Sequence, residues 1–352
     1  MRLARRLTLG ALLLAAVSAC NAGGGSTPAP SKAPTGSSAA TTAPVSSAAS
    51  QAPQQSAAGN LPTVKIGTVD FDEARVVGEI YAQVLENAGY TVDRTGFGLG
   101  DRSVLAPAIE SGQIDLQPEY IGSRISYEVK QANPSGPPPS GGITGPTGDS
   151  ATNLTDLQQL LTPKNLTVLN YTPAVDTNAF VVRSETATQF NLTTMSDTAA
   201  VQTQLKWGLA TDCPTNPLCG APNGALSQYG LTADTIAGAT LLAACSAPMA
   251  DALKNKTVDV GELCSTQPDI AVNGWVLLQD DKHTQPADNI SPIVRDDFLA
   301  KVDQTAFEKL LNDVSAEIDT ATLTNLYTDI AVNHKDVKDV AAQWLKDKGF
   351  VQ

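Results

Sequence analysis

Strands and helices alternate along residues 63–116, and this pattern limits the fold more than any other feature of the chain. Residues 63–69 alternate between apolar and polar side chains and are rich in β-branched residues, which predicts a strand. Apolar residues recur at helical spacing over 76–88, and Gly89 supplies a stop signal. The same succession follows over 91–116. Such alternation predicts an α/β fold in which helices cover a parallel sheet.

Residues that typically begin and end helices flank the second helix of this unit. Asp101 can accept a hydrogen bond from a backbone N–H of the first turn, as N-cap residues do. Gly112 can take the left-handed conformation in which many helices end. We therefore expect a helix between these two residues, directly after a strand.

The rest of residues 61–352 indicates a second α/β block. A loop rich in proline, glycine and serine spans 134–148. Beyond it, strands are predicted at 167–171, 179–182, 206–210 and 259–264. The last predicted elements are helices, at 305–318, 321–330 and 337–348. A segment of this length is large for one hydrophobic core and typical of two lobes.

The first 60 residues indicate export and attachment to a membrane. Three arginines precede a short apolar run at 7–17, which is typical of a secretory signal rather than a membrane span. The small residues before Cys20 resemble the lipobox of bacterial lipoproteins, which implies that this cysteine is acylated and becomes the first mature residue. An ordinary signal peptide with a chance cysteine is the alternative. We expect residues 1–20 to be a lipoprotein signal peptide.

Residues 21–60 contain almost only alanine, serine, threonine, glycine, proline, glutamine and asparagine. A segment without aromatic side chains cannot bury enough apolar surface to offset the entropy lost on ordering, so it is predicted to be a disordered tether. About 40 such residues have a root-mean-square reach of about 35 Å. The tether would lift the folded part clear of the membrane surface.

The formal net charge of −13 argues against nucleic acid as a partner, because phosphate contacts need a basic surface. Loss of the leader, with its three arginines and no acidic residue, would make the charge still more negative. An acidic surface suits a soluble domain outside the cell.

Four cysteines follow Cys20, and an even number in an exported protein predicts two disulfides. Three pairings are conceivable. We favour Cys213–Cys219, which closes a short loop, and Cys245–Cys264 by elimination. A metal site is the alternative, but the two-residue spacing of zinc knuckles is absent.

The sequence offers little support for an enzyme. His283 and His334 are the only histidines, and both lie in polar segments typical of the surface. No G-x-S-x-G nucleophile motif is present. The glycines at 96–100 follow a strand and precede a helix, but they do not form a dinucleotide-binding motif. They predict a turn where backbone amides can approach a ligand.

Several collinear stretches resemble the OpuAC/ProX-type binding proteins, which serve ABC importers of glycine betaine, choline and related osmoprotectants. These stretches are residues 66–73, 78–83, 86–90, 111–122, 278–282 and 318–323. The block at 111–122, SGQIDLQPEYIG, is similar to the family pattern sGeIDlyPEYtG. Together the stretches cover residues 61–352 in order.

The resemblance implies a type II periplasmic-binding-protein fold, also called a Venus flytrap, with two α/β lobes joined by two hinge crossings. Lobe I would be 61–170 with 279–352, and lobe II would be 171–278. A solute held between the lobes would stabilise a closed form that the permease recognises. It further implies ABC permease and ATPase partners, a monomer without cofactor or metal, and a lipid-anchored place on the extracytoplasmic face of the cell membrane.

The resemblance also implies a ligand site, and this chain departs from it. Members that bind betaine hold its quaternary ammonium group in a cage of tyrosines. Tyr120 matches one cage tyrosine, whereas Asn178, Cys264 and Ala287 stand where the family has others. The arginine that meets the ligand carboxylate is replaced by Asn216. The cage is therefore depleted.

The replacements predict a more polar pocket stiffened by the disulfide at Cys264. Phe71 can supply a new aromatic wall, and Arg102 can meet an anion at the start of a helix. The polar residues expected at the site are Asp70, Arg102, Asn178, Asp212, Asn216, Ser265 and Thr266.

Three functions are compatible with these features. The leading one is the binding lipoprotein of an importer for betaine- or choline-like osmoprotectants. The alternatives are a binding protein for a different small polar solute, and a sensory surface lipoprotein without a role in transport.

Overall fold

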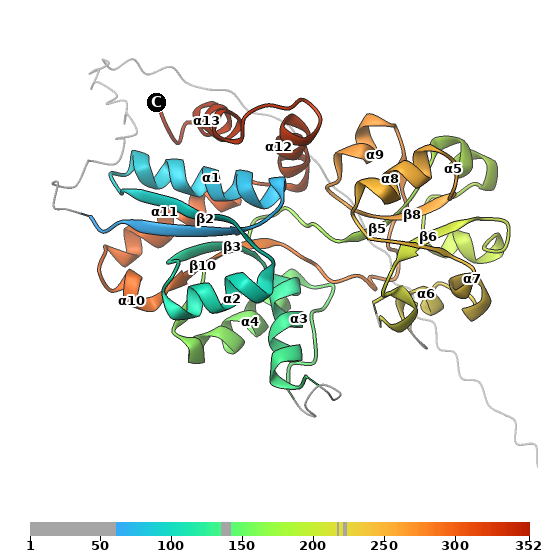
Figure 1. Ribbon diagram of the computed structural model, residues 1–352, viewed down its shortest axis with the longest axis horizontal. Coiled ribbons are helices and arrows are strands. Elements are labelled where there is room, and N and C mark those ends of the chain that lie inside the picture. Colours follow the sequence, from blue (N-terminus) through green and yellow to red (C-terminus); the bar gives the residue numbers. More distant parts are fainter. Residues whose placement is uncertain (1–60, 135–141, 217, 221–223) are drawn as a thin grey trace, which may run out of the picture. The chain divides into compact units, whose positions relative to one another are not determined.

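The computed structural model describes residues 61–134, 142–216, 218–220 and 224–352. In this part of the chain the strands form two five-stranded sheets with helices on their faces (Figure 1). Cys20, the signal peptide and the tether lie outside the described residues. No helix within the described ranges combines the length and the apolar character needed to cross a membrane.

The first sheet has the order β2-β1-β3-β10-β4. Its strands are β1 (Val64–Val69), β2 (Val92–Gly100), β3 (Leu116–Tyr120), β4 (Leu166–Val168) and β10 (Ile290–Arg295). β1 pairs in parallel with β2 and β3, as the alternation predicts, whereas β10 runs antiparallel to β3 and β4. β10 arrives from a distant part of the chain, which no local signal indicates.

Helices pack on both faces of this sheet. They are α1 (Asp72–Asn87), α2 (Arg102–Ser111), α3 (Ile121–Ala132), α4 (Ser150–Leu161), α10 (Asp296–Leu299), α11 (Gln304–Ala316), α12 (Thr320–Ala331) and α13 (Val337–Asp347). α1 covers one face and α2 the other (Figure 1). Their apolar sides share one hydrophobic core with the three terminal helices. This core holds the first turn of α1 and the end of β3 in place.

The ends of α2 are as the sequence predicts. Asp101 is the N-cap, and its carboxylate accepts a hydrogen bond from Ser103 N at 2.8 Å. Gly112 follows the helix with φ of 80°, in the left-handed region that glycine adopts without strain. These two caps place the start of α2 beside the end of β3.

The sequence predicts a short third strand at 114–116, but the strand begins at Leu116 and runs through Pro118 to Tyr120. A proline usually ends a strand, since it cannot donate to the ladder. Here Pro118 lies opposite Pro292 of β10, so neither partner leaves a backbone donor unpaired. The extended strand carries Glu119 and Tyr120 into the region between the two sheets.

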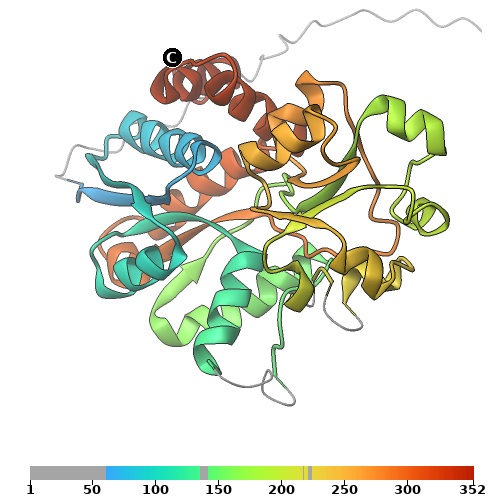
Figure 2. The same cartoon turned by 45° about the vertical axis from the view of Figure 1, so that its right-hand side comes forward.

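The second sheet has the order β7-β6-β8-β5-β9. Its strands are β5 (Asn178–Val182), β6 (Trp207–Ala210), β7 (Thr240–Leu242), β8 (Val260–Cys264) and β9 (Val276–Leu277). Its helices are α5 (Ser184–Phe190), α6 (Ala225–Gln228), α7 (Ala233–Ala237), α8 (Ala247–Lys254) and α9 (Pro268–Val272). Figure 2 shows the yellow and orange helices on opposite faces of this sheet. Short 3₁₀ helices occur at Thr162–Lys164, Ser196–Ala200 and Cys213–Thr215.

Both favoured disulfides are present in this half of the chain. Cys213 pairs with Cys219, and Cys245 pairs with Cys264. The second bond ties the loop before α8 to the last residue of β8. The end of β8, which leads to Ser265 and Thr266, is therefore held from two sides.

Two segments connect the sheets and run side by side. Val175 bridges Asn289 in antiparallel fashion, and Asp176 N donates to Asp288 O at 3.0 Å. Residues 279–285, assigned to lobe I at the sequence level, instead hydrogen-bond to the second half, since Gln279 N donates to Thr193 O. We therefore place the crossings at about 171–177 and 286–289, and the division into lobes I and II stays a prediction.

Candidate functional site

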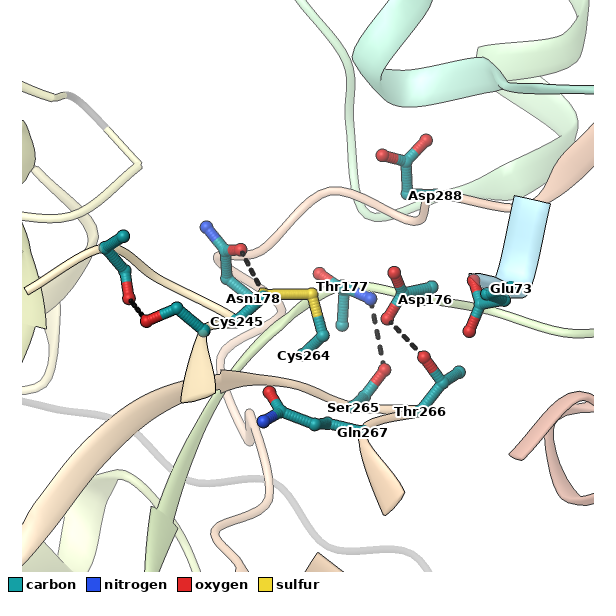
Figure 3. Close-up of a disulfide and its surroundings, with 12 residues drawn as sticks. Glu73, Asp176, Thr177, Asn178, Cys245, Cys264, Ser265, Thr266, Gln267 and Asp288 are labelled. Atoms are coloured by element: carbon teal, nitrogen blue, oxygen red, sulfur yellow. Dashed lines mark hydrogen bonds between the residues drawn. A yellow bond between two sulfur atoms is a disulfide. The ribbon is translucent and has the colours of Figure 1, made fainter. Parts of the chain in front are cut away.

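A group of acidic and aromatic side chains meets where the two sheets adjoin the crossing segments. Glu73 comes from the first turn of α1, Tyr120 from the end of β3, and Asp176 from the first crossing. Tyr120 Oη donates to Glu73 Oε1 at 2.6 Å. Thr266, just beyond β8, donates to Asp176 Oδ1 at 2.9 Å. Figure 3 shows Glu73, Asp176 and Thr266 close to one another.

The two carboxylates lie in an environment that disfavours their negative charge. Glu73 is 1% exposed, and burial raises its pKa, with a further increase from the charge of Asp288. Burial also raises the pKa of Asp176 well above its usual range, and the charge of Glu73 adds to this. Glu73 Oε2 is buried and has no hydrogen-bond partner. A cation at this point would relieve both carboxylates.

Three aromatic rings belong to the same group. The rings of Phe71 and Tyr120 have centroids 5.6 Å apart, and Phe71 is 43% exposed whereas Tyr120 is buried. Tyr327 of α12 is the third. Burial and then the charges of Glu73 and Asp72 raise the pKa of its hydroxyl to about 12, and α12 packs against α1. We call Phe71, Glu73, Tyr120, Asp176 and Tyr327 the acid–aromatic cluster.

Sequence reasoning named only two members of this cluster, Phe71 and Tyr120. Glu73 lies within the stretch 66–73 that resembles the family, and Asp176 lies two residues before Asn178, which stands where the family has a cage tyrosine, so the sequence offered a signal near both. Nothing local marks Tyr327, because it lies on a helix whose spacing indicates packing against a core.

Arg102 lies near the cluster, but a buried carboxylate holds its guanidinium. Arg102 Nε is 3.1 Å from both oxygens of Glu119, and Nη2 is 2.8 Å from Glu119 Oε1. Glu119 is 1% exposed and also accepts from Tyr120 N at 2.8 Å. The predicted contact of Arg102 with a ligand anion would compete with this ion pair, and it stays a prediction.

Asp288, in the second crossing, accepts hydrogen bonds from the start of α3 and forms no ion pair among the described residues. Its carboxylate accepts from Gly122 N at 2.8 Å and from Ser123 N at 3.1 Å, at the start of α3. The Ser123 hydroxyl also donates to it at 2.6 Å. Burial raises the pKa of Asp288 to about 6. Asp288 therefore fixes the crossing against α3 and adds negative charge beside Glu73.

Three predicted residues of the second half, Asn178, Ser265 and Thr266, lie around the Cys245–Cys264 disulfide (Figure 3). Asn178 lies opposite Cys264 in the β5–β8 ladder, with its Oδ1 3.9 Å from Cys245 Sγ. Ser265 Oγ accepts from Thr177 N at 3.0 Å. Ser265 thus ties the first crossing to the end of β8, next to the Thr266–Asp176 hydrogen bond.

Three predicted residues lie apart from this arrangement. Asp70 is exposed and forms an ion pair with Arg75. Asn216 Nδ2 donates to Asp212 Oδ2 at 3.1 Å, in the loop of the Cys213–Cys219 disulfide. Within the described ranges, no hydrogen bond or ion pair joins these three residues to the cluster, so their predicted role at the ligand has no support in the contacts.

Among the described residues, few contacts support the alternatives of a metal site and a histidine-based enzyme. Cys213, Cys219 and Glu262 come together closely, but the two cysteines are bonded to each other. His283 and His334 are exposed and have φ of 51° and 52°. Both lie in turns rather than beside a nucleophile.

Two open cavities of about 460 and 520 Å³ lie away from the cluster. The first is lined by Arg94 and Lys338 among others, and the second by Lys164 and Arg295. Neither cavity contains a cluster residue. We therefore take the buried charges and aromatic rings of the cluster, rather than these surface hollows, as the candidate ligand site.

Comparisons with known proteins place the chain in context. Residues 62–347 match the family model described as the substrate binding domain of ABC-type glycine betaine transport systems, OpuAC. The glycine betaine-binding protein YehZ of Escherichia coli (strain K12) is 28% identical over 294 residues, which cover 82% of this chain and 92% of that protein. A glycine-betaine-binding protein of Pseudomonas aeruginosa is 28% identical over 296 residues, covering 81% and 88%.

A solved structure supports the fold. The crystal structure of a glycine betaine/carnitine/choline ABC transporter protein has a TM-score of 0.67 at 21% identity, and the match covers 82% of this chain and 99% of that chain. The predicted type II periplasmic-binding-protein fold is confirmed by this likeness.

Proposed function

Because the chain belongs to the family of substrate-binding domains of ABC-type glycine betaine transport systems, we propose that its acid–aromatic cluster binds the quaternary ammonium group of a betaine- or choline-type solute. One observation carries this proposal: Tyr120 and Phe71 stand 5.6 Å apart beside the buried carboxylate of Glu73. Aromatic faces and a carboxylate are the groups that attract an ammonium ion without hydrogen-bond donors.

The physical basis is the attraction of a cation to aromatic rings. Each ring face contributes about 0.5–2 kcal/mol, depending on how far water is excluded. Tyr120 would keep one face of the family's cage, and Phe71 and Tyr327 would supply two more in place of the tyrosines that this chain lacks. The cage would then be partly rebuilt from other positions.

The cluster also suits a binding protein that changes conformation. Glu73 and Tyr120 belong to the first half of the fold, whereas Thr266 belongs to the second and bonds Asp176 of the crossing. A solute that contacts both halves would stabilise one arrangement of the lobes, which the ABC permease and its ATPase partner would recognise. The protein would act by binding and delivery, not by catalysis.

Calorimetric titration of the purified chain with glycine betaine, choline and carnitine tests this proposal. We expect saturable binding of at least one of them, and a loss of about tenfold or more in Tyr120→Ala, equivalent to 1.4 kcal/mol. Tyr120→Phe is the matched control, because it keeps the ring and removes only the hydroxyl bonded to Glu73. Absence of binding, or full affinity in Tyr120→Ala, would refute the proposal.

The proposal includes a monomer anchored through Cys20 on the extracytoplasmic face of the cell membrane, with residues 21–60 as its tether. It rests on the sequence, since these residues lie outside the described structure. Acyl chains on one cysteine would suffice for stable anchoring. Cys20→Ala should move the protein from the membrane fraction to the soluble fraction, and unchanged membrane association would contradict the anchor.

A further inference from the structure

We propose that the acid–aromatic cluster selects a solute with net positive charge, such as choline, over a zwitterion with the same trimethylammonium group, such as glycine betaine. This inference rests on the proposed function and narrows its substrate class. It follows from the ionisable groups around the cluster: several are carboxyl groups, and the nearby basic group among the described residues, Arg102, is paired with Glu119.

The acidic groups around the cluster come from two helices and both crossing segments. Glu73 and Asp72 belong to α1, Asp176 to the first crossing, Asp288 to the second, and Asp269 to α9. The charges of these groups act on Tyr120 or Tyr327, as the raised pKa values of both hydroxyls indicate. A ligand at the rings therefore lies within the field of several carboxylates.

Glu73 provides a second, independent observation that points to a ligand. The side chain is 1% exposed, and its Oε1 is satisfied by Tyr120 Oη. Its Oε2 is equally buried and accepts from no donor. A buried carboxylate oxygen without a partner is costly, so a cation or a hydroxyl donor of the ligand is its natural complement.

The basic groups near the cluster are already bound to other acids. Arg102 is the basic side chain whose charge interacts with Tyr120 and Asp288, and Glu119 holds it through three contacts of 2.8–3.1 Å. If Arg102 turned toward a ligand, the buried carboxylate of Glu119 would lose its close ion pair. Among the described residues, Arg124 would then be its ion-pair partner, with Nη1 at 3.8 Å. Arg75 is paired with Asp70.

A zwitterion and a cation therefore meet different fields in this site. The ammonium group is attracted in both cases. The ammonium group favours the ionised form of Glu73 and Asp176, whose pKa values burial raises. The carboxylate of betaine, only a few ångströms from that ammonium, opposes their ionisation because like charges repel. The hydroxyl of choline occupies the same place without charge and can donate to Glu73 Oε2.

Paired calorimetric titrations of choline and glycine betaine into the full chain test the inference. We expect choline to bind at least about tenfold more tightly than betaine. Asp176→Asn removes one negative charge and keeps an acceptor for Thr266; it should weaken choline binding and reduce the preference at least about threefold. Glu73→Gln should act in the same direction. Asp313→Asn, on the exposed side of α11, is the control and should leave both affinities unchanged.

The results separate this inference from the proposed function. Betaine binding as tight as choline binding, or a preference that Asp176→Asn and Glu73→Gln leave unchanged, would overturn the charge selection. Loss of betaine binding in Tyr120→Ala would in that case still support the ammonium site. Binding of neither solute would refute the proposed function itself. Circular dichroism melts show whether each variant is folded before its affinity is compared.

Discussion

Replacing Glu262 with glutamine should stabilise the protein at pH 8. Glu262 lies on β8 and is 1% exposed. Its Oε2 accepts from Ala210 N at 2.8 Å and lies 3.6 Å from Cys219 Sγ. Within the described ranges, no basic side chain forms an ion pair with it. Burial, and to a smaller degree the charge of Asp212, raises its pKa from 4.5 to about 7.

The sign of the effect follows from proton binding. Between pH 4.5 and about 7, the folded state keeps a proton on Glu262 that the unfolded chain has already released. The free energy of unfolding therefore falls as pH rises through this range and stays low above it. At 1.36 kcal/mol per pKa unit, the loss amounts to at most about 3 kcal/mol. Glutamine has no charge in either state and still accepts from Ala210 N.

Urea unfolding at pH 5 and pH 8 measures this difference. We expect Glu262→Gln to resemble the wild type at pH 5 and to exceed its unfolding free energy by about 1–3 kcal/mol at pH 8. Asp251→Asn, at an exposed position of α8, is the control and should change neither value by more than about 0.5 kcal/mol. The same loss of stability between pH 5 and pH 8 in wild type and Glu262→Gln would refute the reasoning.

Two further changes test the local structure. Removing the Cys245–Cys264 bond by a double alanine substitution opens a loop with a sequence separation of 19 and should lower the unfolding free energy by about 3 kcal/mol. The same change at Cys213–Cys219, with a separation of 6, should lower it by about 2 kcal/mol. Thermal melts of both variants compare the losses, and a reversed order would contradict the loop-closure argument. Asp101→Ala removes the cap of α2 and should lower the unfolding free energy by about 1 kcal/mol. Asp101→Ser keeps a side-chain acceptor and should retain most of the wild-type unfolding free energy. Equal urea midpoints for all three proteins would show that the cap contributes nothing.

Short-range signals made much of the fold predictable. The cap at Asp101 bonds an N–H two residues away, and Gly112 ends its helix through its own backbone. The Cys213–Cys219 bond likewise joins residues that six positions separate. In each case the interacting groups lie close together along the chain, so the sequence contains the whole interaction.

The site depends on residues that only the tertiary fold brings together. Arg102 looks free to meet an anion until β3, extended through Pro118, brings Glu119 beside it. Tyr327 lies within the field of Glu73 because α12, far along the chain, packs near α1. Residue types and local spacing contain neither fact. The family resemblance predicted Tyr120, and the sequence offered Phe71 as a new aromatic wall, but nothing local indicated Tyr327.

A crystal structure of the protein with choline bound tests the central claim most directly. The account predicts the trimethylammonium group against the rings of Tyr120, Phe71 and Tyr327, with Glu73 as its nearest carboxylate. A solute bound elsewhere, for example beside Asp212 and Asn216 with the cluster empty, would contradict it.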